Sequence, residues 1–132
     1  MRKLDQTTYV FVRQLTVADL DEAAASGIRL IVNNRPDGEE PGQPASAEIE
    51  AAARAAGLDY RQIPISGGFP PERIEAMAEA LEHGPVLLFC RSGTRSTFLW
   101  AMARARRGAS AEASVAAAAA AGYDLRPIRA WL

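Results

Sequence analysis

The chain has 132 residues, of which 48% are apolar and 23% are charged, and its formal net charge at pH 7 is −1. This length suits a single domain over residues 1–132, because single domains usually have about 100–150 residues. The small net charge argues against a basic nucleic-acid surface and an acidic tail. One cysteine and one histidine exclude an internal disulfide and disfavour a structural zinc site.

No segment of the sequence predicts membrane insertion. The chain becomes polar directly after Met1, unlike a signal peptide, and the alanine run at 116–121 is too short and too weakly apolar to cross a bilayer. We therefore expect no membrane partner, no nucleic-acid partner and a cytoplasmic location.

The first part of the chain alternates between strand and helix patterns. Residues 9–12 are rich in strand formers. Thr16 and Asp19 resemble a capping box that opens a helix ending near Gly27. The apolar run 28–32 lies between turn residues, which predicts a buried strand.

Residues 33–45 predict a long loop, because they contain two asparagines, three prolines and two glycines. Long ordered loops in compact domains are often functional. Ser46 is placed to cap the next helix, and Gly57 is placed to end it.

The second part continues the alternation. Strands are expected at 58–65 and 86–89, with a helix between them that starts at Pro70 or Pro71. Further helical segments are expected from Arg95 onward, at 109–121 and at 125–132. Strands alternating with helices indicate an α/β fold with a central, mainly parallel sheet flanked by helices on both faces.

The segment after the apolar strand 86–89 carries the strongest functional signal. Its backbone N–H groups and the N-terminus of the following helix favour a bound anion. Guanidinium groups add positive charge, and a cysteine thiol in such a place has a lowered pKa and reacts as a thiolate. We therefore predict a catalytic Cys90 and Arg95, with an anion-binding loop formed by Arg91, Ser92, Gly93, Thr94 and Ser96.

This loop resembles two known active-site loops, those of rhodaneses and of tyrosine and dual-specificity phosphatases. The segments 31–40 and 60–65 follow the dual-specificity phosphatase layout. The segments 12–16, 33–39 and 90–96 are similar to the beta-lactamase hydrolase-like, phosphatase-like family of small bacterial proteins. The resemblance implies a protein-tyrosine/dual-specificity-phosphatase-like fold. It leaves both phosphate hydrolysis and sulfur transfer open, since the family includes proteins described in both ways.

Two features of the loop depart from the phosphatase pattern. Phosphatases of this kind place the arginine six positions after the cysteine, whereas Arg95 is five positions after Cys90. A shorter loop makes a tighter ring of N–H groups, as in rhodaneses. Phosphatases usually have a histidine before the cysteine, but here that residue is Phe89, and His83 is expected in a solvated helix end.

The third departure is a missing general acid. Cleavage of a phosphate ester needs a proton for the leaving oxygen, yet the matching segment 66–71 contains no carboxylate. Asp59, Glu72 and Asp37 are the substitutes that the sequence offers. Sulfur transfer expels a good leaving group and needs no such acid.

Further residues are candidates for the pocket around the cysteine. Arg35 and Asp37 lie on the long loop and could line the mouth of the pocket, where Arg35 could pair with a carboxylate. Phe69 is a candidate apolar wall, or a core residue. Ser96 could donate a hydrogen bond to the Cys90 sulfur or cap the helix.

The sequence therefore favours a sulfurtransferase that acts through a Cys90 persulfide on a small anionic or persulfide substrate, without a metal or organic cofactor. The first alternative is a phosphatase that forms a cysteinyl-phosphate with the same residues. The second is a non-catalytic anion-binding module. Family resemblance also suggests a functional link to a persulfide dioxygenase.

Overall fold

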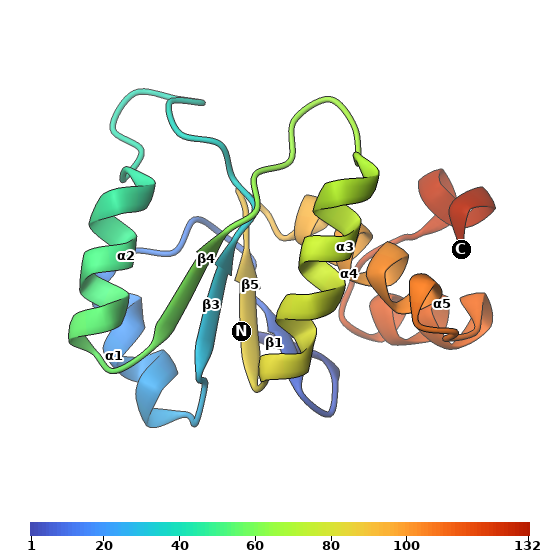
Figure 1. Ribbon diagram of the computed structural model, residues 1–132, viewed down its shortest axis with the longest axis horizontal. Helices are drawn as coiled ribbons and strands as arrows, with labels where there is room; N and C mark the ends of the chain where they lie inside the picture. The colour runs from blue at the N-terminus through green and yellow to red at the C-terminus, as the bar shows by residue number, and fades with distance from the viewer.

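A computed structural model describes residues 1–132, which form one five-stranded sheet with the strand order β1-β2-β5-β3-β4 (Figure 1). Strands β2, β5, β3 and β4 are parallel, and β1 pairs with β2 in the antiparallel direction. The expected mainly parallel sheet is confirmed. The strands are β1 (Arg2–Asp5), β2 (Thr8–Val10), β3 (Leu30–Asn33), β4 (Asp59–Gln62) and β5 (Val86–Phe89).

Helices cover both faces of the sheet, as the alternating pattern predicts (Figure 1). Helices α1 and α2 pack on one face, and α3, α4 and α5 lie on the other. No helix combines the length and the apolar character that crossing a membrane requires. The helices are α1 (Val17–Ala25), α2 (Ser46–Ala55), α3 (Pro71–Ala80), α4 (Thr94–Arg106) and α5 (Ala111–Ala120), with 3-10 turns η1 (Leu81–His83) and η2 (Arg126–Trp131).

The central strand β5 is apolar throughout because both of its faces are covered. Val86 and Leu88 point into the core beneath α3 and α4, whereas Leu87 and Phe89 point into the core beneath α1 and α2. This two-residue alternation is the normal geometry of a strand. Burial of both faces makes β5 a rigid platform for the loop that follows it.

The edge strand β1 is the main element that the sequence pattern did not predict. It contains three charged residues, and only Leu4 is buried. Charged residues on an edge strand protect it from pairing with other chains, but they also hide its strand character. The neighbouring strand β2 ends at Val10, earlier than expected, although the N–H of Phe11 still donates to the carbonyl of Leu88.

Two helix starts show one correct and one wrong capping prediction. The Asp19 carboxylate accepts a hydrogen bond from the backbone N–H of Thr16 at 2.8 Å, as a capping box requires, and another from the Thr16 hydroxyl at 2.9 Å. Ser46, in contrast, is the first residue inside α2 rather than its cap. Its hydroxyl contacts Tyr60, while its backbone N–H donates to the Asp37 carboxylate at 2.8 Å.

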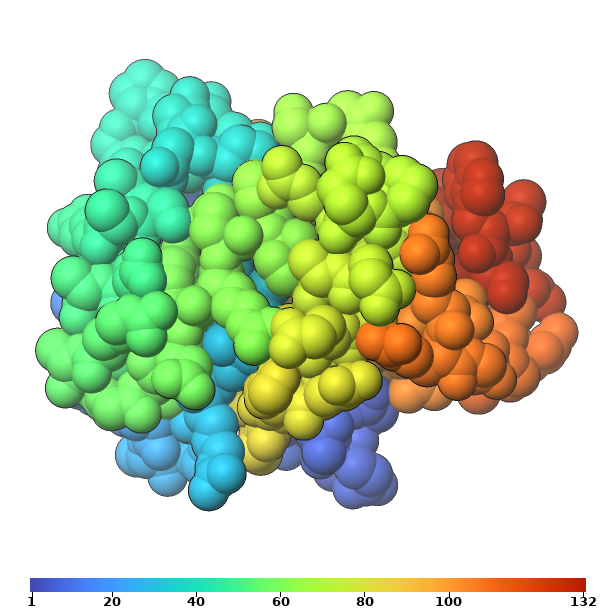
Figure 2. All heavy atoms as spheres, viewed as in Figure 1, coloured from blue at the N-terminus to red at the C-terminus, as the bar shows by residue number.

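The C-terminal residues form an apolar groove at the side of the molecule far from α2 (Figure 2). The groove has a volume of about 690 Å³ and is lined by residues of α3, α4 and the C-terminal turn, including Ile74, Met102 and Ile128. Trp131 borders it and is 68% exposed.

Candidate active site

The site lies where the carboxyl ends of three parallel strands meet. Loops 34–45, 63–70 and 90–93 follow β3, β4 and β5 at the same edge of the sheet (Figure 1). In open α/β sheets this edge is the usual place for ligands. The structure therefore brings the long loop and the cysteine loop, which are far apart in sequence, to one place.

Cys90 follows β5 directly and is 1% exposed. The backbone N–H of Gly93 donates to its sulfur at 3.2 Å. Burial alone raises the pKa of the Cys90 thiol, but hydrogen bonds from the backbone N–H groups of Ser96, Ser92 and Gly93 outweigh burial and lower it. A lowered pKa raises the ionised fraction of the thiol, and the thiolate is its nucleophilic form.

Gly93 allows the loop to curl around the sulfur. It precedes α4 with a φ of +92°, a left-handed conformation that favours glycine. A Cβ atom at this position would lie only 2.2 Å from the hydroxyl oxygen of Tyr123. Both the backbone conformation and the available space therefore require glycine here.

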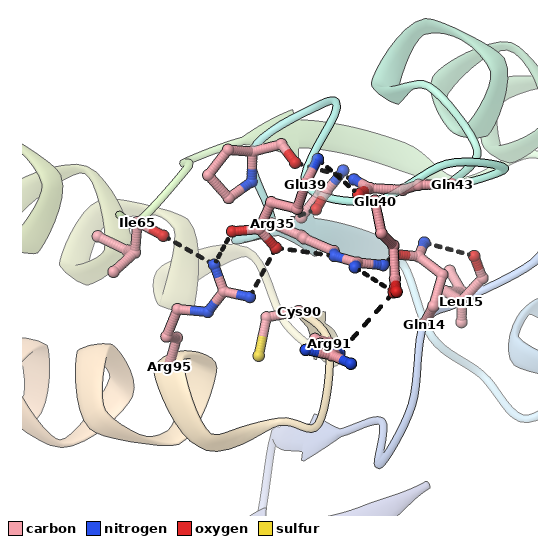
Figure 3. Close-up of polar contacts among 12 residues, drawn as sticks. Gln14, Leu15, Arg35, Glu39, Glu40, Gln43, Ile65, Cys90, Arg91 and Arg95 are labelled. Atoms are coloured by element: carbon pink, nitrogen blue, oxygen red, sulfur yellow. Dashed lines mark hydrogen bonds and ion pairs between the residues drawn. The ribbon is translucent and has the colours of Figure 1, made fainter. Parts of the chain in front are cut away.

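Arg95 is held beside the cysteine by a carboxylate (Figure 3). Its two terminal nitrogens donate to the two oxygens of Glu39 at 2.7 and 2.9 Å, and one of them also donates to the Ile65 carbonyl at 3.0 Å. The hydrogen bonds with Glu39 raise the pKa of Arg95, and the nearby charge of Cys90 raises it further. The guanidinium is thus fixed and charged next to the sulfur.

Glu39 is itself shared between two arginines. The Nε of Arg35 donates to the Glu39 carboxylate at 2.9 Å, and hydrogen bonds from Arg95 and then Arg35 lower the pKa of Glu39 to about 2. Arg35 is 2% exposed, and its other nitrogens donate to Gln14 and to Glu40. Arg35 therefore pairs with carboxylates as expected, and its nitrogens support Glu39 and Glu40 (Figure 3).

A second buried chain of hydrogen bonds supports the other side of the loop. The hydroxyl of Ser96 lies near the sulfur of Cys90 and donates to the side-chain oxygen of Asn34 at 2.7 Å. The side-chain nitrogen of Asn34 donates to the Ile63 carbonyl at 2.9 Å. Sequence reasoning missed Asn34, although its place just after β3, a neighbour of β5, could have indicated it.

The remaining loop residues contribute mainly through their backbone. The side chains of Arg91, Ser92 and Thr94 are exposed, and Arg91 approaches Glu40 at 3.8 Å. The hydroxyls of Ser92 and Thr94 lie 3.1 Å apart.

Two candidate pocket residues serve other structural roles. Asp37 binds the backbone N–H of Ser46 at the start of α2, where a carboxylate is favourable for the helix. Phe69 packs against Phe98, with ring centroids 6.3 Å apart, and lines the apolar groove at the C-terminus. No hydrogen bond or ion pair joins Asp37 to Cys90 or Arg95, and the place of both residues at the pocket stays a prediction.

The structure also narrows the search for a general acid. Asp59 is the first residue of β4, so it lies at the amino-terminal ends of the parallel strands, whereas Cys90 follows the carboxyl end of β5. His83 also lies at the amino-terminal ends of the strands, just before β5, and its ring contacts Glu79. Glu39 binds Arg95, but with a pKa of about 2 it holds no proton at neutral pH. Among the proposed substitutes, Glu72 lies in the first turn of α3, directly after loop 63–70.

Comparison with known proteins places these features in a family. The profile of the beta-lactamase hydrolase-like protein, phosphatase-like domain family matches residues 2–107. The chain is 44% identical over 103 residues to the beta-lactamase hydrolase-like protein of Agrobacterium fabrum, covering 72% of this chain and 23% of that protein. For the Xylella fastidiosa (strain Temecula1) protein of the same name, identity is 42% over 113 residues, with coverages of 83% and 26%. The chain thus spans about a quarter of the length of these curated relatives.

Solved structures agree with this placement. A Neisseria meningitidis protein provisionally described as a phosphatase is 34% identical, with a TM-score of 0.84 over 98% of this chain and 93% of its own. The active form of Tk-PTP, at 20% identity, has a TM-score of 0.72 over 98% and 90% of the two chains, which supports the fold alone. The chain belongs to the phosphatase-like domain family of beta-lactamase hydrolase-like proteins.

Proposed function

We propose that this domain is a cysteine-dependent phosphatase. The observation that carries the proposal is the buried Cys90 sulfur, which receives hydrogen bonds from the loop and lies beside an Arg95 guanidinium fixed by Glu39. The sequence alone favoured sulfur transfer, but the family and the solved relatives support phosphate hydrolysis better. We therefore propose phosphate hydrolysis as the first candidate reaction and sulfur transfer as the second.

In the first step, the Cys90 thiolate attacks the phosphorus of a phosphate monoester. An S–P bond forms while the P–O bond to the leaving group breaks, and the leaving oxygen departs as an anion that solvent water protonates. Backbone N–H groups of the loop and the Arg95 guanidinium bind the phosphoryl oxygens as their charge redistributes. The fork of an arginine suits two oxygens of such a group.

In the second step, water attacks the cysteinyl-phosphate. The S–P bond breaks, inorganic phosphate leaves, and the sulfur recovers its negative charge. The backbone N–H of Gly93, 3.2 Å from the sulfur, is placed to donate to the departing thiolate. The same hydrogen bonds that lower the pKa of Cys90 therefore also favour its release as a leaving group.

Sulfur transfer is the second candidate, and the loop length favours it. Arg95 follows Cys90 by five positions rather than six, and no protonated carboxylate has been identified beside the sulfur. In that reaction the thiolate attacks the outer sulfur of thiosulfate, sulfite leaves, and an acceptor thiolate removes the sulfur from the Cys90 persulfide. A functional link to a persulfide dioxygenase would follow from this candidate only.

A side-by-side assay tests the proposal. Purified protein is incubated with p-nitrophenyl phosphate, and separately with thiosulfate and cyanide, together with the Cys90→Ser variant. A phosphatase releases nitrophenol and phosphate, and the serine variant loses this activity because a hydroxyl is far less ionised than a thiol. The proposal fails if phosphate esters stay intact while thiosulfate, added without cyanide, attaches one sulfur atom to Cys90, measured by intact mass.

A third outcome is that neither substrate reacts. The rate of Cys90 alkylation by iodoacetamide then decides whether the thiolate is activated. Slow alkylation, typical of an ordinary buried thiol, would favour the non-catalytic anion-binding module and contradict both enzymatic candidates.

A further inference from the structure

One peptide group of the cysteine loop is hydrogen-bonded on both sides. The hydroxyl of Tyr123 donates to the carbonyl of Ser92 at 2.8 Å. The N–H of Gly93 donates to the sulfur of Cys90 at 3.2 Å. The carbonyl of Ser92 and the N–H of Gly93 belong to the same trans peptide and therefore point in opposite directions.

We propose that Tyr123 is a positioning residue of the active site, whose hydroxyl holds the Ser92–Gly93 peptide with its N–H directed at the Cys90 thiolate and at the bound anion. The inference rests on Cys90 being the nucleophile of the proposed function. It extends the site to a residue outside the segment 2–107 that the family profile matches.

The orientation of this peptide depends on its two hydrogen bonds, because the glycine that follows it restricts the backbone little. Gly93 has a φ of +92° and no side chain, so rotation of the preceding peptide meets little steric resistance. Ser92 is exposed, and Tyr123 is the partner of its carbonyl. A rotated peptide would direct the carbonyl oxygen, rather than the N–H, towards the thiolate, and this would weaken binding of any anion.

Other contacts hold the neighbouring parts of the loop but not this peptide. The carbonyl of Gly93 accepts hydrogen bonds from the backbone N–H of Thr97 at 2.9 Å and from its hydroxyl at 2.7 Å. These contacts fix the peptide that follows Gly93 to the first turn of α4. The orientation of the preceding peptide is therefore the degree of freedom that Tyr123 controls.

Tyr123 is itself well placed to act as a donor. Its backbone N–H donates to the Ala118 carbonyl at 2.8 Å at the end of α5, and its ring packs against the core. Burial raises the pKa of the Tyr123 phenol; Arg2 opposes this, and the negative charge at Cys90 adds to it, so that the net shift is upward. The hydroxyl consequently keeps its proton at neutral pH and can donate to Ser92.

The test compares Tyr123→Phe with the wild-type protein by following Cys90 alkylation with iodoacetamide as a function of pH. Phenylalanine keeps the ring and removes only the hydroxyl. We expect the pKa of Cys90 to rise by about 0.5 unit or more, since one of its few donors loses its orientation. Alkylation at a pH below both pKa values should then slow about 3-fold.

Tyr9→Phe is the matched control, because Tyr9 lies on β2 and is also partly buried. It should leave the alkylation profile unchanged. Thermal unfolding of both variants separates a loss of stability from a change in the thiol, since a purely structural role of Tyr123 would lower the unfolding temperature without moving the pKa of Cys90.

An unchanged Cys90 pKa in Tyr123→Phe would overturn the inference. Its failure is distinguishable from failure of the proposed function, because alkylation is measured on the free protein without any substrate. A shifted pKa in a protein that cleaves no phosphate ester would support Tyr123 as a positioning residue and reject the phosphatase. Phosphatase activity together with an unshifted Cys90 pKa in Tyr123→Phe would support the phosphatase and reject Tyr123 as a positioning residue.

Discussion

The carboxylate of Glu39 receives two hydrogen bonds from the guanidinium of Arg95, one to each oxygen, at 2.7 and 2.9 Å. Two parallel bonds fix the plane of the guanidinium as well as its position. The buried Arg35 binds the same carboxylate from another side. Arg95 is therefore oriented before any substrate arrives, and this reduces the cost of ordering it during the reaction.

Replacing Glu39 should reduce activity without removing the nucleophile. In Glu39→Gln, Arg95 keeps its charge but loses the paired oxygens, so we expect kcat/KM to fall about 10- to 100-fold. Glu40→Gln is the matched control, since Glu40 also binds Arg35 but makes no hydrogen bond with Arg95. Equal losses in the two variants would contradict a specific role of Glu39 in holding Arg95.

Glu39 should also make stability depend on pH. Its pKa in the folded state, about 2, lies below its usual value near 4.5. A lowered pKa stabilises the folded state above the unfolded value, and this contribution is lost as the pH falls from about 5 towards 2. Urea unfolding should show the wild type more stable than Glu39→Gln at pH 7, with a difference that shrinks below pH 5. A difference that is constant from pH 7 to pH 3 would be evidence against the paired carboxylate.

The fork of Arg95 should matter more than its charge. In Arg95→Lys one ammonium group must serve both Glu39 and the substrate, so we expect a loss of about 100-fold or more in kcat/KM. Arg91→Lys should change activity little, because the side chain of Arg91 is 69% exposed and its contact with Glu40 is 3.8 Å long. Wild-type rates in Arg95→Lys would show that the backbone N–H groups suffice.

The elements that could be predicted from the sequence are those whose signal is local. The structure of the apolar strand β5 and of the glycine-containing loop after it depends on neighbouring residues in the sequence. The anion-binding loop around Cys90 could therefore be predicted. The Thr16 and Asp19 pair likewise lies within one helical turn. The charged edge strand β1 could not be predicted, because its pairing with β2 outweighs a polar sequence.

The parts of the site that sequence reasoning missed depend on long-range contacts. Asn34 reaches Ser96 across 62 positions of sequence, and Tyr123 reaches the Ser92 carbonyl across 31. Asp37 lies on the same long loop, and its carboxylate binds the N-terminus of α2, a contact that the sequence did not indicate. The order of strands and helices in the sequence is enough to assign a loop to the carboxyl ends of the strands. The direction of each side chain depends on packing.

The last prediction concerns the leaving group. Glu39 is ionised, the segment 66–71 has no carboxylate, and Asp59 lies at the far edge of the sheet. A positioned general acid contributes about 100- to 10,000-fold when the leaving oxygen is basic. Without one, the enzyme should cleave p-nitrophenyl phosphate at least about 100-fold faster than an alkyl phosphate such as phosphoserine, because nitrophenolate leaves without a proton. Comparable rates on both esters would mean that an acid is present. Glu72, in the first turn of α3 next to this segment, is then the carboxylate to test. A Glu72→Gln variant that loses activity on the alkyl ester alone would identify it, since removal of an acid affects only substrates whose leaving group needs the proton.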